Sequence, residues 1–372
     1  MSTLKVNAIL DASGGNTATI NSMTPTADSL QGFRNRIING GMVIDQRNAG
    51  ASVTLSSEKY PVDRFVCRAT TATNSTAQQS STVPTGFSKS LLYTTGTGAT
   101  PSASDRNTIM HIIEGNNLSD LGWGAAGAKT VTLSFWVRSS LTGTFGGSLA
   151  NGSVDRSYPF TYTISSANTW EYETITIPGD TTGTWATNNT AGMYVWFDMG
   201  CGSNSLGTAG AWAAADYRGA TGDTKLISTT GATFYITGVQ LEVGSVATPF
   251  ERRDYGTELS RCQRYYYRFT SRGVGYFGCG TNNGTTNNVC IVQFPVPMRT
   301  APTALEQSGT AGNYQVQQGG TITTCSAVPV YNYADTESAT VQSTVASGLT
   351  IGYAAFLRAV NSSAYLGWSA EL

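Results

Sequence analysis

Charged side chains are scarce in this sequence, and this scarcity excludes several classes of partner. Only 12% of the 372 residues are Asp, Glu, Lys or Arg, and the formal net charge is -1. We therefore expect no field that attracts nucleic-acid phosphates or anionic lipid. No run approaches the roughly 20 apolar residues of a membrane helix, and the opening MSTLKVNAIL lacks the apolar core of a secretory signal. The sequence predicts a protein that binds no nucleic acid and inserts into no membrane.

Histidine is almost absent, which limits the catalytic chemistry. The single one, His111, lies in the apolar run 109–113, a setting typical of a strand residue with a satisfied hydrogen bond. We find no Gly-x-Ser-x-Gly elbow, no phosphate-binding glycine loop and no His-Glu-x-x-His motif. Paired carboxylates stay open, because such pairs are not local in a chain. We expect the chain not to be an enzyme.

Cysteine pairs are also missing. The six cysteines never form a Cys-x-x-Cys motif, so neither a zinc site nor a disulfide framework is indicated. Because cysteine is among the most buried residue types, we expect free and mostly buried thiols. No cofactor is expected.

Glycine, serine, threonine and asparagine are abundant instead, which favours turns and β-structure over helix. Short strand-like runs joined by such residues, without helical periodicity between them, predict an all-β protein built on a two-sheet jelly roll. The last strand changes its apolar face at Gly238, as at a β-bulge. The expected runs are 65–70, 88–94, 108–114, 130–138, 158–164, 170–177, 192–199 and 232–243.

Two of these strands are expected to supply much of the core. On the first, Val131, Leu133, Phe135 and Val137 alternate with polar residues. On the second, Tyr194 and Trp196 are the first choice for the core side, with Met193, Val195 and Phe197 as further candidates.

Changes in texture divide the chain into four parts. Residues 1–32 form an N-terminal arm, a hairpin too small to be stable without a partner, or else a frayed terminus. Residues 33–253 form the jelly-roll sandwich with its lead-in segment, and residues 254–268 a helical connector. Residues 269–372 form a C-terminal β-domain, with strands near 273–279, 287–296, 312–317, 321–331, 338–345 and 350–359.

The connector is the one helix that the sequence predicts. Thr257 is expected to cap it, and Leu259, Cys262 and Tyr266 fall at helical spacing. Three such helices meeting along that edge in a homotrimer, or one helix lying on its own sandwich, are the two arrangements considered.

Several phrases resemble bacteriophage virion proteins. Residues 33–65, with NGGM, IDQR and YPVDRF, resemble the segment that opens many bacteriophage tail-fibre and related proteins, and FPVPMRTAPT (294–303) resembles a phrase common in phage tail proteins. In the first segment Asp63 and Arg64 are expected to form a buried structural pair. The phrases KTVTLSFWVR, WEYETITIP and ITGVQLEVG resemble the carbohydrate-binding jelly rolls of phage tail proteins and of glycoside-hydrolase accessory modules.

This resemblance implies a function. The expected protein is a homotrimeric tail fibre of the virion, assembled in the bacterial host cytoplasm, that binds host surface polysaccharide. Residues 1–32 would attach it to other tail or capsid proteins. The first rival is a purely structural virion component, such as an adaptor, nozzle or capsid fibre. The lesser rival is a glycan depolymerase, which usually carries a repetitive β-helix that this sequence lacks.

Sugar binding predicts exposed aromatic side chains, because sugar rings present apolar C–H faces. Trp123, Trp185 and Trp212 lie in loops beside glycine and small residues and are the glycan-binding candidates, each with a plain loop anchor as the alternative. Trp136 and Trp196 lie inside strand patterns and are expected in the core. A structural calcium ion is a weaker expectation, with Asp120, Asp198 and Asp216 as its candidate ligands, as related modules often have.

Overall fold

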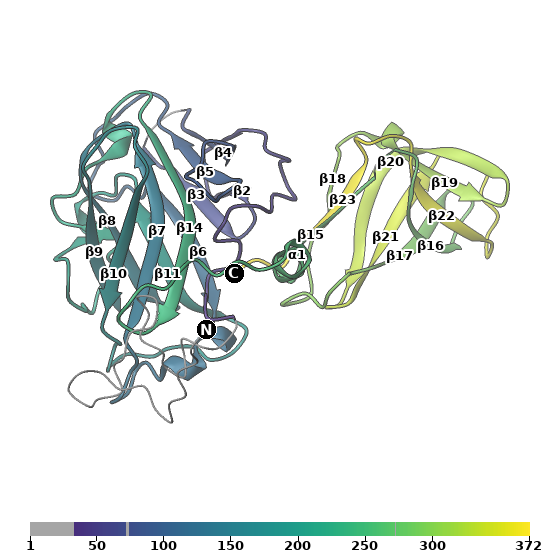
Figure 1. Cartoon of the computed structure of the whole chain (residues 1–372). Helices are drawn as coiled ribbons and strands as arrows, with labels where there is room; N and C mark the ends of the chain where they lie inside the picture. Colours follow the sequence, from purple (N-terminus) through teal and green to yellow (C-terminus); the bar gives the residue numbers. More distant parts are fainter. Residues whose placement is uncertain (1–32, 72–73, 272) are drawn as a thin grey trace, which may run out of the picture. The chain divides into compact units, whose positions relative to one another are not determined.

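The computed structural model describes residues 33–71, 74–271 and 273–372 (Figure 1). The expected arm, residues 1–32, lies outside the described residues. The chain divides between Arg253 and Asp254 into two compact units. The fold is nearly all β, as predicted, with one α-helix among the described residues.

The first unit is a sandwich of two six-stranded antiparallel sheets (Figure 1). In order, one sheet holds β1 (Val53–Thr54), β4 (Thr76–Ser80), β5 (Ser90–Thr94), β14 (Thr233–Val243), β7 (Val131–Ser139) and β10 (Glu171–Ile177). The other holds β2 (Lys59–Val62), β3 (Phe65–Arg68), β6 (Thr108–Glu114), β11 (Ala191–Asp198), β8 (Gly143–Asn151) and β9 (Ser157–Ile164). Smaller elements are η1 (Gly115–Asn117), η2 (Ser119–Leu121), η3 (Ser203–Ser205), η4 (Leu226–Ser228) and the parallel pair β12 (Leu206–Gly207) and β13 (Gly219–Ala220).

Each expected run of the sandwich contains a strand, but β1, β2, β4 and β8 were not predicted, and β8 is the longest of these. Its sequence, GTFGGSLAN, has too many glycines to look like a strand. The glycines are there because neighbours press against the backbone: a Cβ on Gly147 would collide with the carbonyl of Trp196 and the ring of Phe160. Strand propensity therefore does not indicate β8, because close packing against its backbone requires glycine.

Burial confirms the predicted core face of β7 and corrects the predicted core face of β11. On β7, Val131, Leu133, Phe135 and Val137 are buried between the sheets as predicted. On β11 the core side chains are instead Met193, Val195 and Phe197. The first choice was wrong because residues 193–197 are apolar on both faces, so alternation could not choose between them.

Two tryptophans therefore lie on the outer faces. Trp196 is buried there, stacked on Tyr194 with ring centroids 5.0 Å apart and covered by the guanidinium of Arg218. Trp136 was expected in the core but is half-buried, because its neighbours on β7 take the inner positions. It pairs across the strands with Tyr172, with ring centroids 5.3 Å apart.

The bulge expected at Gly238 is confirmed. The pairing of β14 with β7 shifts register between Thr237 and Gln240, and Gly238 has φ +63°. This left-handed backbone conformation favours glycine. The shift lets β14 bury Phe234 and Ile236 on one side of the bulge and Val239 and Leu241 on the other.

Asn39 organises the lead-in segment. Its side chain is fully buried, donates to the carbonyls of Ile44 and Asp63 at 2.9 and 2.8 Å, and accepts from the Ile44 amide at 3.0 Å. Asp63 and Arg64 are both buried, as expected. Asp63 accepts from the amide of Gln46 at 3.0 Å, and Arg64 donates to the carbonyl of Ile112 at 2.6 Å.

His111 lies on β6 as a buried strand residue. Its Nε2 is 3.1 Å from the amide nitrogen of Ile38, and its ring packs edge-on against Phe65. Burial, and then the charge of Arg64, lower the pKa of His111 well below its usual value, so the ring is neutral. This placement fits a structural histidine.

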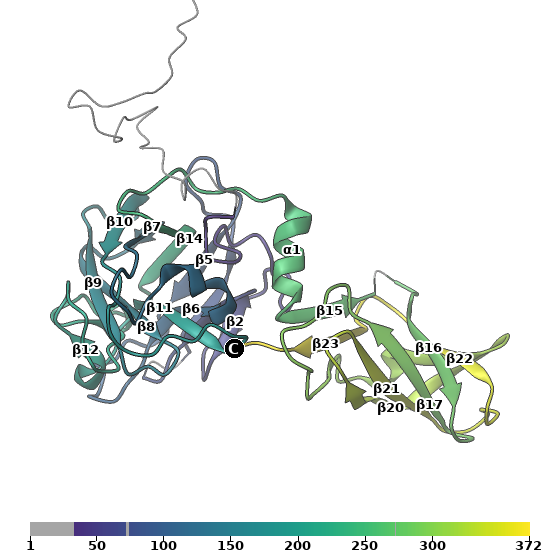
Figure 2. The ribbon, with the colours of Figure 1, turned by 90° about the horizontal axis from the view of Figure 1, so that it is seen from below.

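The second unit begins with α1 (Tyr255–Gln263), which leads directly into β15 (Tyr266–Thr270) (Figure 2). The cap is Asp254, not Thr257: its carboxylate accepts from the amide of Thr257 at 2.9 Å and from its hydroxyl at 2.5 Å. An aspartate at this position satisfies an otherwise unpaired helix amide. Tyr266 pairs with Ser369 in the sheet, so the helical edge predicted to include Tyr266 ends earlier.

A closed barrel follows, built in the order β16 (Tyr276–Asn282), β17 (Asn287–Gln293), β21 (Ser338–Val345), β20 (Thr321–Ala334), β19 (Tyr314–Gln318) and β22 (Ala354–Ala359). Beside it, β15 pairs with β23 (Tyr365–Ser369), which pairs with β18 (Glu306–Gln307); η5 (Ala311–Asn313) precedes β19. Trp368, Tyr314 and Leu357 are fully buried in the core of this unit. No helix in the described part is long and apolar enough to cross a membrane.

Candidate functional site

The three loop tryptophans converge at one place on the sandwich. Trp123 follows η2, Trp185 lies between β10 and β11, and Trp212 lies between β12 and β13. The ring centroids of Trp123 and Trp185 are 4.6 Å apart, those of Trp123 and Trp212 5.4 Å, and those of Trp185 and Trp212 5.7 Å. The rings meet edge to face, the arrangement that aromatic quadrupoles favour. We call these three residues the indole cluster.

Each indole N–H is bound to the protein, which fixes the ring in place. Trp123 donates to the carbonyl of Lys129 at 2.7 Å and Trp212 to that of Pro178 at 2.8 Å. Trp185 donates to the carboxylate of Asp180 at 3.3 Å. The polar edges are thus satisfied internally, and what each ring can offer a ligand is apolar surface.

Asp180 supports the loop that carries Trp185. It is 1% exposed, and Arg156 grips both of its oxygens, with Nε at 3.0 Å and Nη2 at 2.6 Å. The amide and the hydroxyl of Thr182 also donate to it, both at 3.2 Å. Burial alone would raise the pKa of Asp180, but the Arg156 and Thr182 bonds outweigh it and lower the pKa. Asp180 therefore stays ionised and holds the loop in one shape.

The indole cluster is half-buried. Its inner side packs against the sandwich core, and Tyr158 lies behind Trp212 with ring centroids 5.3 Å apart. The residues beside the rings in sequence are small and exposed, among them Ala126, Thr184 and Ala211. Side chains this short leave part of the aromatic surface open to solvent.

The structure gives each aspartate of the expected calcium site a cationic partner of its own. Asp120 binds Arg36 at 2.5 Å. Asp216 is 3.0 Å from both Arg106 and Arg218, and Asp198 is 2.9 Å from Lys225. The described residues contain no group of three or more His, Cys, Asp or Glu that could hold a metal ion.

Asp198 instead belongs to a buried ionic cluster with Asp223 and Lys225. The Lys225 ammonium contacts both carboxylates. Gly219 and Gly146 make room for them, since a Cβ on either glycine would collide with a carboxylate oxygen. Burial, followed by the charge of Asp198, raises the pKa of Asp223 to about 8. The lysine occupies the position between the carboxylates that a cation would take.

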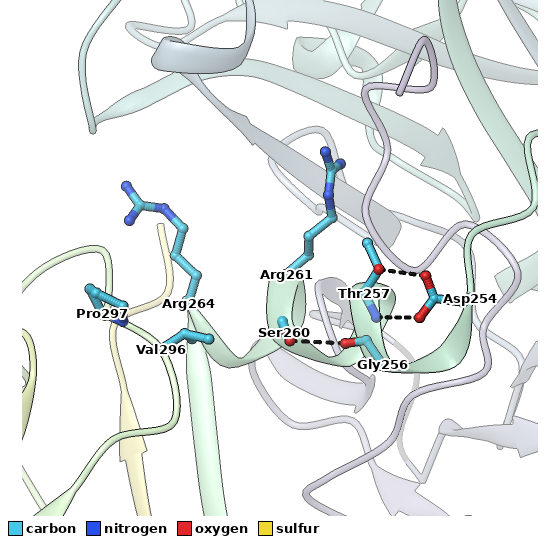
Figure 3. A pocket seen from close by; sticks show the side chains of 8 residues that line it. All are labelled: Asp254, Gly256, Thr257, Ser260, Arg261, Arg264, Val296 and Pro297. Carbon is cyan, nitrogen blue, oxygen red and sulfur yellow. Dashed lines mark hydrogen bonds between the residues drawn. The ribbon is translucent and has the colours of Figure 1, made fainter. Parts of the chain in front are cut away.

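An open groove of about 690 Å³ runs along α1 in the second unit (Figure 3). It is lined by Thr257, Ser260, Arg261, Arg264 and neighbouring residues. The two hydroxyls already serve the helix, because Thr257 donates to Asp254 and Ser260 donates to the carbonyl of Gly256 at 2.9 Å. Both hydroxyl groups are therefore already used as donors within the helix and are not available as donors to a ligand.

No family model matches this chain, and no curated protein matches it. Among solved structures, it is similar to the enzymatically active domain of tailspike protein 4 of bacteriophage CBA120, with 12% identity and a TM-score of 0.28. That alignment covers 57% of this chain and 22% of the tailspike domain, so the chain spans less than a quarter of that protein's length.

The chain is also similar to carbohydrate-binding modules, with identities and TM-scores in the same range. The module TmCBM61, solved with β-1,4-galactotriose, is 8% identical with a TM-score of 0.28 over 57% of this chain and 99% of that one. A family 11 module of Clostridium thermocellum is 12% identical with a TM-score of 0.27 over 54% of this chain and 100% of that one. These likenesses are too distant to assign a function, which has to be argued from the site.

The sequence pointed to the three tryptophans but not to their surroundings. Asp180, Arg156 and Tyr158 were not anticipated. Asp180 lies in the turn-rich stretch PGDTTGT, where a side chain that binds the amide two residues on is a recognised turn signal. The Arg156 partner could not be found this way, because it lies 24 residues away on another loop.

Proposed function

We propose that this chain is a virion protein, a trimeric tail fibre that binds host surface glycan through the indole cluster of its sandwich. The observation that carries the proposal is the convergence of Trp123, Trp185 and Trp212. Three loops far apart in sequence each contribute one ring to the same half-exposed surface. A loop anchor needs only a ring buried beneath its own loop, whereas these rings pack on one another at the boundary with solvent.

The physical case rests on preorganisation. A sugar ring is recognised in part by contact of its C–H face with an aromatic surface. Because the three N–H bonds and the Asp180–Arg156 ion pair already hold the indoles, binding need not order them and loses little side-chain entropy. The open surface is apolar, as the C–H faces of a polysaccharide require.

The virion setting is supported by sequence. Residues 33–65 and 294–303 resemble bacteriophage tail proteins, and the short arm of residues 1–32 suits attachment to other tail or capsid proteins. In this proposal the protein acts on the virion, after assembly in the bacterial cytoplasm.

A bacterial-polysaccharide array probed with the full chain tests the proposal. We expect the wild type to bind one class of surface glycan, and Trp123→Ala, Trp185→Ala and Trp212→Ala each to weaken that binding about tenfold or more. Trp170→Ala is the matched control: Trp170 is also half-buried on the sandwich but packs against Tyr235, with ring centroids 6.2 Å apart.

Two outcomes would overturn it. A wild type that binds no glycan on the array would favour the purely structural virion component. Release of reducing ends from a bound polysaccharide would establish the depolymerase instead. Thermal melting of each variant checks that the sandwich is folded, so that loss of binding is not mistaken for loss of structure.

A further inference from the structure

The outer wall of the C-terminal barrel carries large apolar side chains that face solvent. Strand alternation puts them there: on β17, Cys290 and Val292 point into the barrel while Ile291 between them is 49% exposed. Phe356 on β22 is 46% exposed, and Tyr333 on β20 is 63% exposed.

The strand registers join these side chains into one row. Cys279 on β16 lies directly opposite Ile291 on one side and Phe356 on the other. Directly opposite residues on one face of a sheet are in contact range. Continuing outward through the pairs, the row runs Ile322, Gln317, Phe356, Cys279, Ile291, Thr340, Tyr333.

This row, which we call the girdle, winds once around the barrel, and its ends, Ile322 and Tyr333, lie at separate positions along β20. Its members lie in turn on β20, β19, β22, β16, β17, β21 and again β20, so it crosses all six strands (Figure 1). Tyr276, 52% exposed, widens it beside Phe356, with ring centroids 5.3 Å apart. Apart from Gln317 and Thr340 the row is apolar or thiol, and several large apolar side chains gathered on one exposed surface mark an interaction site.

The girdle also lacks charge. The six barrel strands contain one charged residue, Arg358, whose guanidinium donates to the side chain of Gln317 at 3.1 Å. Depletion of charge together with exposed aromatic and aliphatic side chains is the composition of an interface centre.

We propose that the girdle is the contact surface between copies of this chain in a cyclic homo-oligomer. An uncharged wall fits a second copy of itself, because no like charges meet, whereas a charged partner would find no opposite charge to pair with. The girdle occupies several sides of the barrel, so one neighbour cannot cover it. In a ring, each copy presents two different sides to two neighbours, and three copies make the smallest such ring. The inference rests on the trimer of the proposed function, whose contact surface it locates, and not on glycan binding by the sandwich.

Cys279 provides a reporter at the centre of the girdle. All six cysteines of the chain are described and free, and Cys279 is the exposed one. In the proposed oligomer its thiol is covered, since its neighbours Ile291 and Phe356 are contact residues. Maleimide labelling of Cys279 therefore reads out coverage of the girdle without any substitution.

Sedimentation of the full chain tests the proposal, read together with the labelling rate. We expect a mass three times the 39.2 kDa of one chain, and labelling of Cys279 that speeds up on dilution. Ile291→Glu and Phe356→Glu each place a charge in the girdle, and we expect either to give a folded monomer that labels at least tenfold faster. The matched control is Thr163→Glu, an exposed strand position on β9 of the sandwich, which should leave the mass unchanged.

Three results would contradict the proposed contact surface. A wild type that sediments as a single chain at tens of micromolar would overturn the proposal. So would an oligomer that keeps its mass in both girdle variants, or in which Cys279 labels as fast as in the monomer, because association would then use another surface. Tyr333→Glu, on the opposite side of the barrel, repeats the test should one variant fail to fold.

Discussion

Asn39 combines two roles at the start of the sandwich. It adopts φ +61°, a left-handed conformation that asparagine tolerates better than most residues. From there its buried amide group bonds the backbone of Ile44 and Asp63. A single side chain thus ties the lead-in segment to Asp63, in the turn before β3.

We expect Asn39→Ala to lower the free energy of unfolding of the sandwich by about 3 kcal/mol, because buried backbone groups lose their partners. Asn39→Gly separates the causes: it keeps the backbone conformation and should be about 1 kcal/mol less destabilising than the alanine variant. Urea denaturation followed by tryptophan fluorescence reads out this unit, since six of the seven tryptophans lie in residues 123–212. Equal losses in the two variants would show that φ contributes nothing.

Asp223 makes the stability of the sandwich depend on pH. Its pKa in the folded chain, about 8, exceeds the roughly 3.9 of an unfolded aspartate, so the folded chain binds this proton more tightly. Its contribution to stability is full below about pH 4 and is lost as the pH rises through about 8. The slope in that window is at most about 1.4 kcal/mol for each pH unit.

Asp223→Asn imitates the protonated acid and should remove this dependence. We expect the melting temperature of the wild type to fall, relative to that of the variant, between pH 5 and pH 8. The comparison between the two proteins cancels the titration of groups away from this cluster, so the difference reports Asp223 together with its contacts Asp198 and Lys225. A constant difference across that range would mean that Asp223 is ionised throughout.

Residue types in the sequence indicated the indole cluster better than they indicated its support. Tryptophan beside glycine in a loop is unusual enough to single out Trp123, Trp185 and Trp212. The aspartates near the loops suggested calcium, but an isolated aspartate carries no sign of whether an arginine or a metal will neutralise it. Only the fold brings Asp120 to Arg36 and Asp216 to Arg106, although the second partner of Asp216, Arg218, is close in sequence.

At the scale of elements, alternation predicted what it could resolve. It identified the core face of β7, where polar residues separate the apolar ones, and failed on β11, where both faces are apolar. The helical spacing of Leu259, Cys262 and Tyr266 continued past the end of α1. The aromatic run 265–267 favours a strand, and Tyr266 and Tyr267 pair with β23 instead of continuing the helix.

The β14 bulge yields a prediction for one element. Gly238→Ala should destabilise the sandwich by about 2–3 kcal/mol, because the residue has a positive φ and a Cβ would press on Phe87 and Trp136. Gly231→Ala is the control: Gly231 has φ +73° with nothing within 4 Å of the added Cβ, so only about 1 kcal/mol of backbone strain is expected. Urea midpoints compare the two. Equal shifts would show that the crowding at Gly238 relaxes without cost.

At the scale of the whole molecule, the all-β fold followed from composition and turn chemistry. The closing of the six strands of the second unit into a barrel could not be predicted in this way, because strand order depends on pairings between residues far apart in sequence. The girdle was hidden for the same reason. Its members look like ordinary alternating residues until the registers align them across six strands.

The two proposals divide the work between the two units. The sandwich presents the indole cluster to glycan, and the barrel presents an uncharged girdle to further copies of the chain. If both hold, the oligomer carries several indole clusters, and binding to a repetitive polysaccharide gains from multivalency.

Calorimetric titration of the full chain with the polysaccharide selected on the array tests the central claim most directly. The account predicts a dissociation constant that rises about tenfold or more in Trp212→Ala, measured at a temperature at which the variant is still folded, and stays at the wild-type value in Trp170→Ala. The same dissociation constant in the wild type and in a folded Trp212→Ala would contradict it.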